Sequence, residues 1–127
     1  MGNEGKYISV YVDPKVLSSS WYNDIIFILQ NLQAPYGMDK TKSRFLKLKT
    51  VKFCISDGYI FWKYPGGVLL KCLLENEAKH TIEEFHKGDC GGHHYWKTTV
   101  NKILRAGFYW PNVFSDVYKK VKACHEC

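Results

Sequence analysis

The apolar positions in the first third of the chain recur every three or four residues, which is the spacing of one face of a helix. This stripe consists of Trp21, Ile25, Ile28, Leu29 and Leu32. The serines at 18–20 precede the stripe, and we expect one of them to cap the helix by accepting a backbone N–H. A second helix is expected over residues 40–49, with Phe45 and Leu48 facing inward and its lysines facing solvent.

Between residues 53 and 73 the apolar period changes to two, which is typical of strands. Three strands are expected, over 53–56, 59–63 and 68–73. Asp57-Gly58 favours a tight hairpin between the first two strands, and Pro65-Gly66-Gly67 supplies the second turn. Residues 21–74 therefore predict a small helix plus a three-stranded antiparallel meander, and residues 1–20 a leader or linker with a short strand over 7–12.

The chain from residue 75 onward has a helical pattern. The first helix is expected to begin near Glu75, where acidic side chains suit the helix dipole. A second is expected over 95–106, stopped by Gly107, and a third from Pro111. The inward positions of the three helices are expected to be Ala78, Ile82, Phe85, Val100, Ile103, Leu104, Val113, Phe114, Val117 and Val121. The expected fold class of the whole chain is α+β, with residues 75–127 as a helical bundle.

The chain of 127 residues carries a formal net charge of +6, which favours an anionic partner such as nucleic acid. The positive charges gather in two stretches, and the alternative interpretation of each is a solvated helix face. The first stretch consists of Lys40, Lys42, Arg44, Lys47, Lys49 and Lys52. The candidates for phosphate contact in the second half are Lys97, Lys102, Arg105, Lys119, Lys120 and Lys122.

Cysteine usage and targeting signals bear on the compartment. Five cysteines, an odd number, fit a disulfide framework poorly. No apolar run approaches the roughly 20 residues that a membrane helix needs. The first residues resemble neither a signal peptide nor a myristoylation signal. We therefore expect a reducing compartment, nuclear or cytoplasmic, and no secretion.

The most informative pattern is two histidines followed by two cysteines, His86-x6-His93-x30-Cys124-x2-Cys127. Tetrahedral zinc takes four nitrogen or sulfur donors, and two cysteines spaced in this way at a helix end can reach one ion. Gly91-Gly92 lets the backbone turn tightly before the second histidine. The spacing therefore predicts one zinc ion bound by these four residues.

Other interpretations of these residues stay open. His94 competes with His93 because only geometry separates neighbours, and Cys90 lies where it is able to replace a histidine. The cysteine pair also fits a redox motif, although no βαβ pattern precedes it. His80 and His125 are expected to be exposed, and Cys54 and Cys72 to be core residues.

Three motifs cover residues 85–127 almost without gaps. They are Phe85-His86-x-Gly88-x-Cys90-Gly91-Gly92-His93, then Lys102-Ile103-Leu104-x-x-Gly107-Phe108-Tyr109-Trp110-Pro111, then Phe114-x-Asp116-Val117 with Cys124-x2-Cys127. This part of the chain resembles the integrase zinc-binding region of gypsy-type LTR retrotransposons, especially plant members. Thr98 departs from the family pattern, which has a lysine there. A looser similarity to the extension domain that precedes this region in larger integrases runs through Trp21-Tyr22-x-Asp24-Ile25, Phe45, Asp57-Gly58-Tyr59 and Glu77-Ala78.

The resemblance implies that His86, His93, Cys124 and Cys127 are the zinc ligands. It also implies that Phe108-Tyr109-Trp110-Pro111 packs the zinc-bound helices and caps the last one. The implied role is to help integrase assemble and grip the ends of element DNA, in the nucleus or a cytoplasmic virus-like particle. Family integrases continue into a catalytic core with three metal-binding carboxylates. We expect no cutting or joining of DNA by a chain that stops at Cys127.

The expected partners are DNA, bound largely without sequence preference because no base-reading helix is recognisable, and other integrase copies. No membrane and no small-molecule substrate are expected. A protein–protein interaction module, docking through its aromatic surface on another integrase copy or a host factor, is the alternative from another class. Added salt separates the two, because only phosphate contacts weaken steeply with it. A zinc hydrolase is disfavoured, since four protein donors leave no position for a catalytic water.

Overall fold

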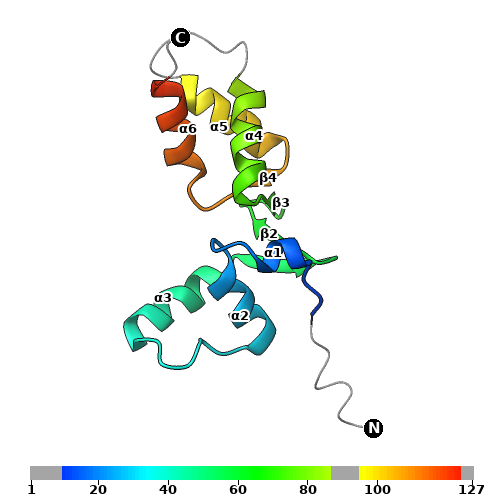
Figure 1. Ribbon diagram of the computed structural model, residues 1–127, viewed down its shortest axis with the longest axis vertical. Helices are drawn as coiled ribbons and strands as arrows, with labels where there is room; N and C mark the ends of the chain where they lie inside the picture. The colour runs from blue at the N-terminus through cyan, green and yellow to red at the C-terminus, as the bar shows by residue number, and fades with distance from the viewer. Residues whose placement is uncertain (1–9, 87–94, 124–127) are drawn as a thin grey trace. The chain divides into compact units, whose positions relative to one another are not determined.

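The computed structural model describes residues 10–86 and 95–123 (Figure 1). The chain is α+β, as predicted, and divides into two compact units, Met1–Gly67 and Val68–Cys127. The sequence pattern had placed a division at 74/75 instead. None of the helices within the described ranges has the length and apolar character that crossing a membrane requires.

Over residues 10–67, the first unit contains three helices and a β-hairpin. Their bounds are α1 Pro14–Leu17, α2 Asn23–Asn31, α3 Lys40–Thr50, β1 Phe53–Ser56 and β2 Tyr59–Lys63. The two strands are antiparallel, as expected, with Phe53 opposite Trp62 and Ser56 opposite Tyr59. Helices α2 and α3 pack against each other and both contact β1. The core of this unit therefore lies between one hairpin strand and two helices.

The hairpin turn also holds the segment that precedes the helices. Asp57 and Gly58 have positive φ values of 51° and 86°, as a tight two-residue turn requires. The Gly58 carbonyl accepts a hydrogen bond from the Asp13 backbone N–H at 2.9 Å, and Val12 forms a bridge with Gly58. Val16 is buried. Residues 12–17, expected from sequence to be part of a leader or linker, are thus built into the first unit.

The expected serine cap of the first long helix is wrong. Helix α2 begins at Asn23, and its N-cap residue Tyr22 makes no side-chain capping bond. The Ser19 hydroxyl instead accepts a hydrogen bond from the Trp21 backbone N–H at 3.3 Å, inside the turn before the helix. The apolar stripe also ends early, because Leu32 is the left-handed C-cap residue and is exposed.

Helix α3 has the predicted bounds to within one residue, but the prediction of its buried face is wrong. Phe45 is 70% exposed and Leu48 is 62% exposed. The helix turns Ser43, Leu46 and Thr50 inward instead, and only Thr50 is fully buried. Periodicity identified the apolar positions of α3. The helix nevertheless turns this narrow side toward the rest of the unit and leaves Phe45 and Leu48 in solvent.

The described part of the second unit, residues 68–86 and 95–123, contains two short strands and three helices. Their bounds are β3 Leu69–Cys72, α4 Glu75–His86, α5 Tyr95–Arg105, β4 Phe108–Tyr109 and α6 Val113–Lys122. Strand β4 was not predicted, because two residues are too short for a visible alternation. It runs parallel to β3, with Lys71 opposite Phe108 and Cys72 opposite Tyr109. This pairing joins β3 to the helical half and accounts for the unit boundary at Gly67.

The buried faces of the three helices largely follow the predicted pattern. Val100, Ile103, Val113 and Val117 are almost completely buried. Phe114 is the exception, because it is 56% exposed on α6. Gly107, at a φ of +96°, follows the end of α5 as expected. The expectation that Pro111 opens the last helix is wrong, since Asn112 is the N-cap residue and the helix begins at Val113.

Candidate metal centre

Three helix ends meet at one end of the second unit. Helix α4 ends there, α5 begins there and α6 ends there (Figure 1), and each pair of these helices is in contact. The ring of Trp96, at the start of α5, lies 5.4 Å from the ring of Tyr118, near the end of α6. Residues 87–94 and 124–127 are joined to these ends, so the chain connects every predicted ligand to the same end of the unit.

His86 is the predicted ligand that lies within the described residues. It is the last residue of α4 and is only 8% exposed, and its Nδ1 atom is inaccessible to solvent. Burial of an imidazole is costly unless its nitrogens bond to another group, and metal coordination satisfies a ring nitrogen in this way. His80, on the same helix, is exposed as predicted. The burial of His86 therefore fits a metal ligand, whereas His80 has the environment of a surface histidine.

A second buried polar group lies in the first half of α5. Thr99 is completely buried, and its Oγ1 has no hydrogen-bond partner among residues 10–86 and 95–123. A buried hydroxyl without a partner costs roughly 1–3 kcal/mol. Thr98, which replaces the lysine of the family pattern, is exposed. The second unit therefore buries a hydroxyl on α5 as well as the imidazole at the end of α4.

The other predicted ligands, His93, Cys124 and Cys127, lie outside the described residues, as do the alternatives His94 and Cys90. Within residues 10–86 and 95–123, no three His, Cys, Asp or Glu side chains gather closely enough to hold a metal ion. The four-residue ligand set therefore stays a prediction. Two imidazoles and two thiolates are nevertheless a donor set that zinc prefers, so the residues present fit this metal.

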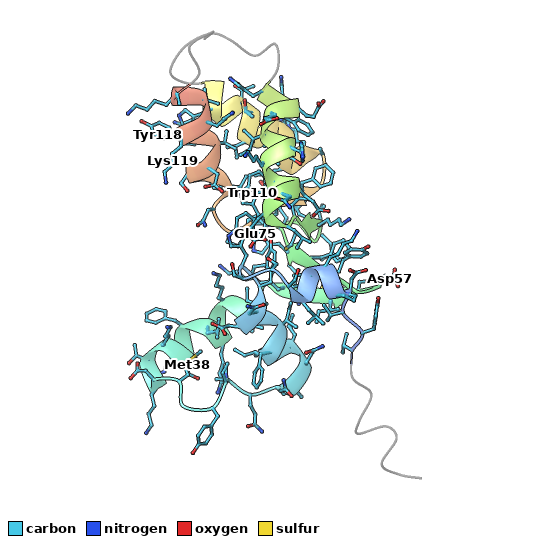
Figure 2. The ribbon with its side chains drawn as sticks, in the orientation of Figure 1. Met38, Asp57, Glu75, Trp110, Tyr118 and Lys119 are labelled. Atoms are coloured by element: carbon cyan, nitrogen blue, oxygen red, sulfur yellow. The ribbon has the colours of Figure 1, made fainter. Side chains whose placement is uncertain are left out.

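Packing around Trp110 holds the opposite ends of the helices together. Trp110 is completely buried, and its Nε1–H donates to the Asp116 carboxylate in the first turn of α6 at 2.9 Å (Figure 2). The Trp110 carbonyl accepts the backbone N–H of Val113 at 3.1 Å, at the start of the same helix. Phe108 and Tyr109 form β4. Trp110 thus packs as the resemblance implied, whereas the N-cap residue of α6 is Asn112 and not a member of the aromatic run.

The strands of the second unit hold a half-buried phenol beside a buried thiol. Burial, and to a smaller extent the neighbouring Cys72, raises the pKa of the Tyr109 hydroxyl above its ordinary value of 10.0. Burial therefore favours the neutral form of this hydroxyl. Cys72 is buried in β3 and Cys54 is half-buried in β1, which matches their prediction as core residues.

The six cations predicted to meet phosphates in this half are all exposed on α5 and α6: Lys97, Lys102, Arg105, Lys119, Lys120 and Lys122. Sequence reasoning missed the aromatic rings beside them. The Lys97 ammonium lies 5.7 Å from the Trp96 ring centroid, and the Lys122 ammonium lies 5.5 Å from that of Tyr118. Trp96, Lys97, Tyr118 and Lys122 thus form an aromatic–cation cluster at the helix ends. Adjacent aromatic and lysine positions were the available signal, but their proximity depends on how α5 packs on α6.

The comparison with known families agrees with this geometry. Residues 75–127 match the family model of the integrase zinc binding domain. The match covers less than half of the chain and includes His86, His93, Cys124 and Cys127. No curated protein and no solved structure gave a match. Residues 75–127 are therefore similar to integrase zinc binding domains, and residues 1–74 lie outside the match.

Proposed function

We propose that this chain is the structural zinc module of a gypsy-type retroelement integrase, with one zinc ion held by His86, His93, Cys124 and Cys127. The observation that carries the proposal is the common end of α4, α5 and α6, where His86 lies buried. The family match over residues 75–127 supports both zinc and an integrase origin. Four protein donors leave no open position for water, so the proposed role is structural and non-catalytic.

In this role the metal links segments that are distant in sequence. Zinc would tie the end of α4 to the end of α6 and hold the start of α5 between them. Binding of this kind contributes on the order of 10 kcal/mol to the folding of a small domain. The helical bundle has a small core of its own, so we expect its folding to depend on the metal.

Zinc content of purified variants tests the ligand set. His93→Ala and Cys124→Ser should each lose the metal and most of the helical signal, because three donors bind zinc far more weakly than four. His80→Ala is the matched control, since this exposed histidine lies on the same helix as His86, and it should keep one zinc per chain. Loss of zinc in His94→Ala but not in His93→Ala would show that His94, and not His93, is the second histidine ligand. Unchanged helicity and melting in a strong chelator would contradict a structural zinc.

The proposed biological role is to support integrase assembly and to bind the ends of element DNA. The exposed cations of α5 and α6 support it, because ammonium and guanidinium groups neutralise phosphates without reading sequence. Lys119 and Lys120 are the best candidates, since both are exposed on the last two turns of α6. Contacts of this kind give dissociation constants of roughly 10⁻⁴ to 10⁻⁶ M at physiological salt.

A protein–protein interaction module is the second candidate. Phe114 and Tyr118 lie one turn apart on α6 and are 56% and 41% exposed. An apolar pair of this kind suits contact with a second integrase copy or a host factor. The two candidates are compatible in an assembled integrase, but they give different behaviour in the isolated chain.

Salt dependence separates these candidates. Lys119→Glu combined with Lys120→Glu should weaken DNA binding and flatten its dependence on salt, while zinc content stays the same. Phe114→Ala combined with Tyr118→Ala should leave the salt dependence unchanged. Self-association that is insensitive to salt, lost in the Phe114 and Tyr118 variant, and unaccompanied by DNA binding would favour the interaction module.

A further inference from the structure

Helix α3 of the first unit presents an apolar ridge to solvent. The ridge consists of Phe45 and Leu48, one turn apart and both more than half exposed. It lies on the side of the helix opposite Ser43 and Thr50, which face inward. Large apolar side chains that are held outward together mark contact surfaces more often than isolated ones do. The ridge is therefore a candidate contact surface.

Cations flank the ridge on both sides. At 100° per residue, Lys40, Arg44 and Lys47 fall on one flank of α3, and Lys42 and Lys49 fall on the other. All five are exposed, and the helix contains no acidic residue. The carboxylate of Asp39, just before the helix, accepts the backbone N–H groups of Thr41 and Lys42 and so is committed to capping. The partner of this face is therefore expected to be anionic on two sides.

One flank is hollowed. Met38, Lys40, Ser43, Arg44 and Lys47 line a shallow hollow of about 310 Å³, and Figure 2 labels Met38 beside the start of α3. Its lining combines three cationic side chains with one hydroxyl and no carboxylate. A guanidinium and two ammonium groups around a space of this size suit a phosphate group.

We propose that α3 binds duplex DNA with its Phe45–Leu48 ridge in the major groove and its flanking cations on the phosphates of both strands. The inference takes DNA as the anionic partner and to that extent rests on the proposed function. The major groove is about 12 Å wide and admits one α-helix between two phosphate walls. Apolar side chains at its floor contact the C5-methyl group of thymine. The ridge thus supplies a base contact that the cations alone do not.

Two other occupants fit the face less well. A helix that lies in a membrane surface needs a broad apolar face, whereas this ridge is two side chains wide and enclosed by cations. A second copy of this chain carries the same net charge of +6, so its approach to five exposed cations is opposed electrostatically. Duplex DNA supplies two anionic walls, with the methyl groups of thymines on the groove floor between them.

Fluorescence anisotropy of the zinc-loaded full chain with a labelled A·T-rich duplex tests the inference. Arg44→Glu combined with Lys47→Glu should weaken binding at least tenfold and lower the salt slope by roughly two. Phe45→Ala combined with Leu48→Ala should keep the salt slope. Melting and zinc content should stay unchanged in both variants, because all four side chains are exposed. The matched control is Lys63→Glu combined with Lys79→Glu, which changes the same amount of charge at two exposed lysines outside α3 and outside the proposed phosphate contacts, and it should keep the affinity for the duplex.

A duplex with deoxyuridine in place of thymidine tests the groove contact itself, because it lacks only the methyl groups. The original chain should bind the thymidine duplex several-fold more tightly, and the Phe45 and Leu48 variant should bind both duplexes equally. Equal binding by the original chain would overturn the groove contact. Loss of DNA binding in the Lys119→Glu and Lys120→Glu variant, with full binding in the Arg44→Glu and Lys47→Glu variant, would overturn the inference and leave the proposed function standing. A chain that binds DNA through α3 but carries no zinc would overturn the proposed function and leave this inference standing.

Tighter binding to phosphatidylserine vesicles than to DNA, or a dimer that is abolished by the Phe45 and Leu48 variant, would also overturn the inference. The ridge would then be the contact surface for a membrane or for a second copy of the chain. Vesicle sedimentation and analytical ultracentrifugation provide these two measurements.

Discussion

Gly58 shows how one residue fixes the first unit. It has a positive φ of 86°, and a Cβ added there would lie 2.7 Å from the Tyr11 ring and 3.2 Å from the Asp13 backbone nitrogen. Its carbonyl also accepts the Asp13 N–H. The residue therefore serves the hairpin turn and the docking of the segment before α1 at the same time. The Asp-Gly dipeptide predicted the turn, but no local pattern predicted the docking.

Gly58→Ala should lower the free energy of unfolding by about 2 kcal/mol or more, because a left-handed conformation and a close contact are penalised together. Gly66→Ala is the control, since Gly66 also has a positive φ, of 98°, but has nothing within 4 Å of an added Cβ. It should cost about 1 kcal/mol. Denaturant unfolding of the zinc-loaded chains measures both, and equal losses would show that the contact with Tyr11 and Asp13 contributes nothing.

At the scale of elements, helix positions were predictable from sequence and buried faces only partly so. The spacing around Val100 and Val117 identified faces that the structure buries. The same reasoning failed for Phe45, Leu48 and Phe114, because periodicity finds apolar residues and does not show which of them meet another element. Strand β4 could not be predicted either, since its two residues are defined by their pairing with β3 rather than by any pattern of their own.

Zinc removal should affect the elements unequally. Helices α2 and α3 pack with β1 inside the first unit, which contains no proposed ligand. Helices α4 and α6 of the second unit would instead lose the zinc ion proposed to join their ends. Hydrogen exchange on the chelated full chain should therefore retain protection in β1, β2 and α2 and lose it in α6. Strand β3 should follow the second unit, because it pairs with β4. Uniform loss of protection across both units would show that they fold as one.

At the scale of the whole molecule, the sequence predicted the α+β class and the existence of a zinc site more readily than the organisation around it. His86 and Cys127 are 41 positions apart, and donor type and spacing predict that they bind one ion, which stays a prediction. The convergence of three helix ends depends on tertiary packing, which spacing does not encode. The unit boundary at Gly67 likewise depends on one parallel strand pair.

X-ray absorption at the zinc edge tests the central claim most directly, because it reports the donors around the metal. The proposed site predicts about one zinc per chain with two sulfur donors at roughly 2.3 Å and two nitrogen donors at roughly 2.0–2.1 Å. Three sulfur donors and one nitrogen would show that Cys90 replaces a histidine. A shell that contains water oxygen, or a chain that folds fully without zinc, would contradict a structural site made by His86, His93, Cys124 and Cys127.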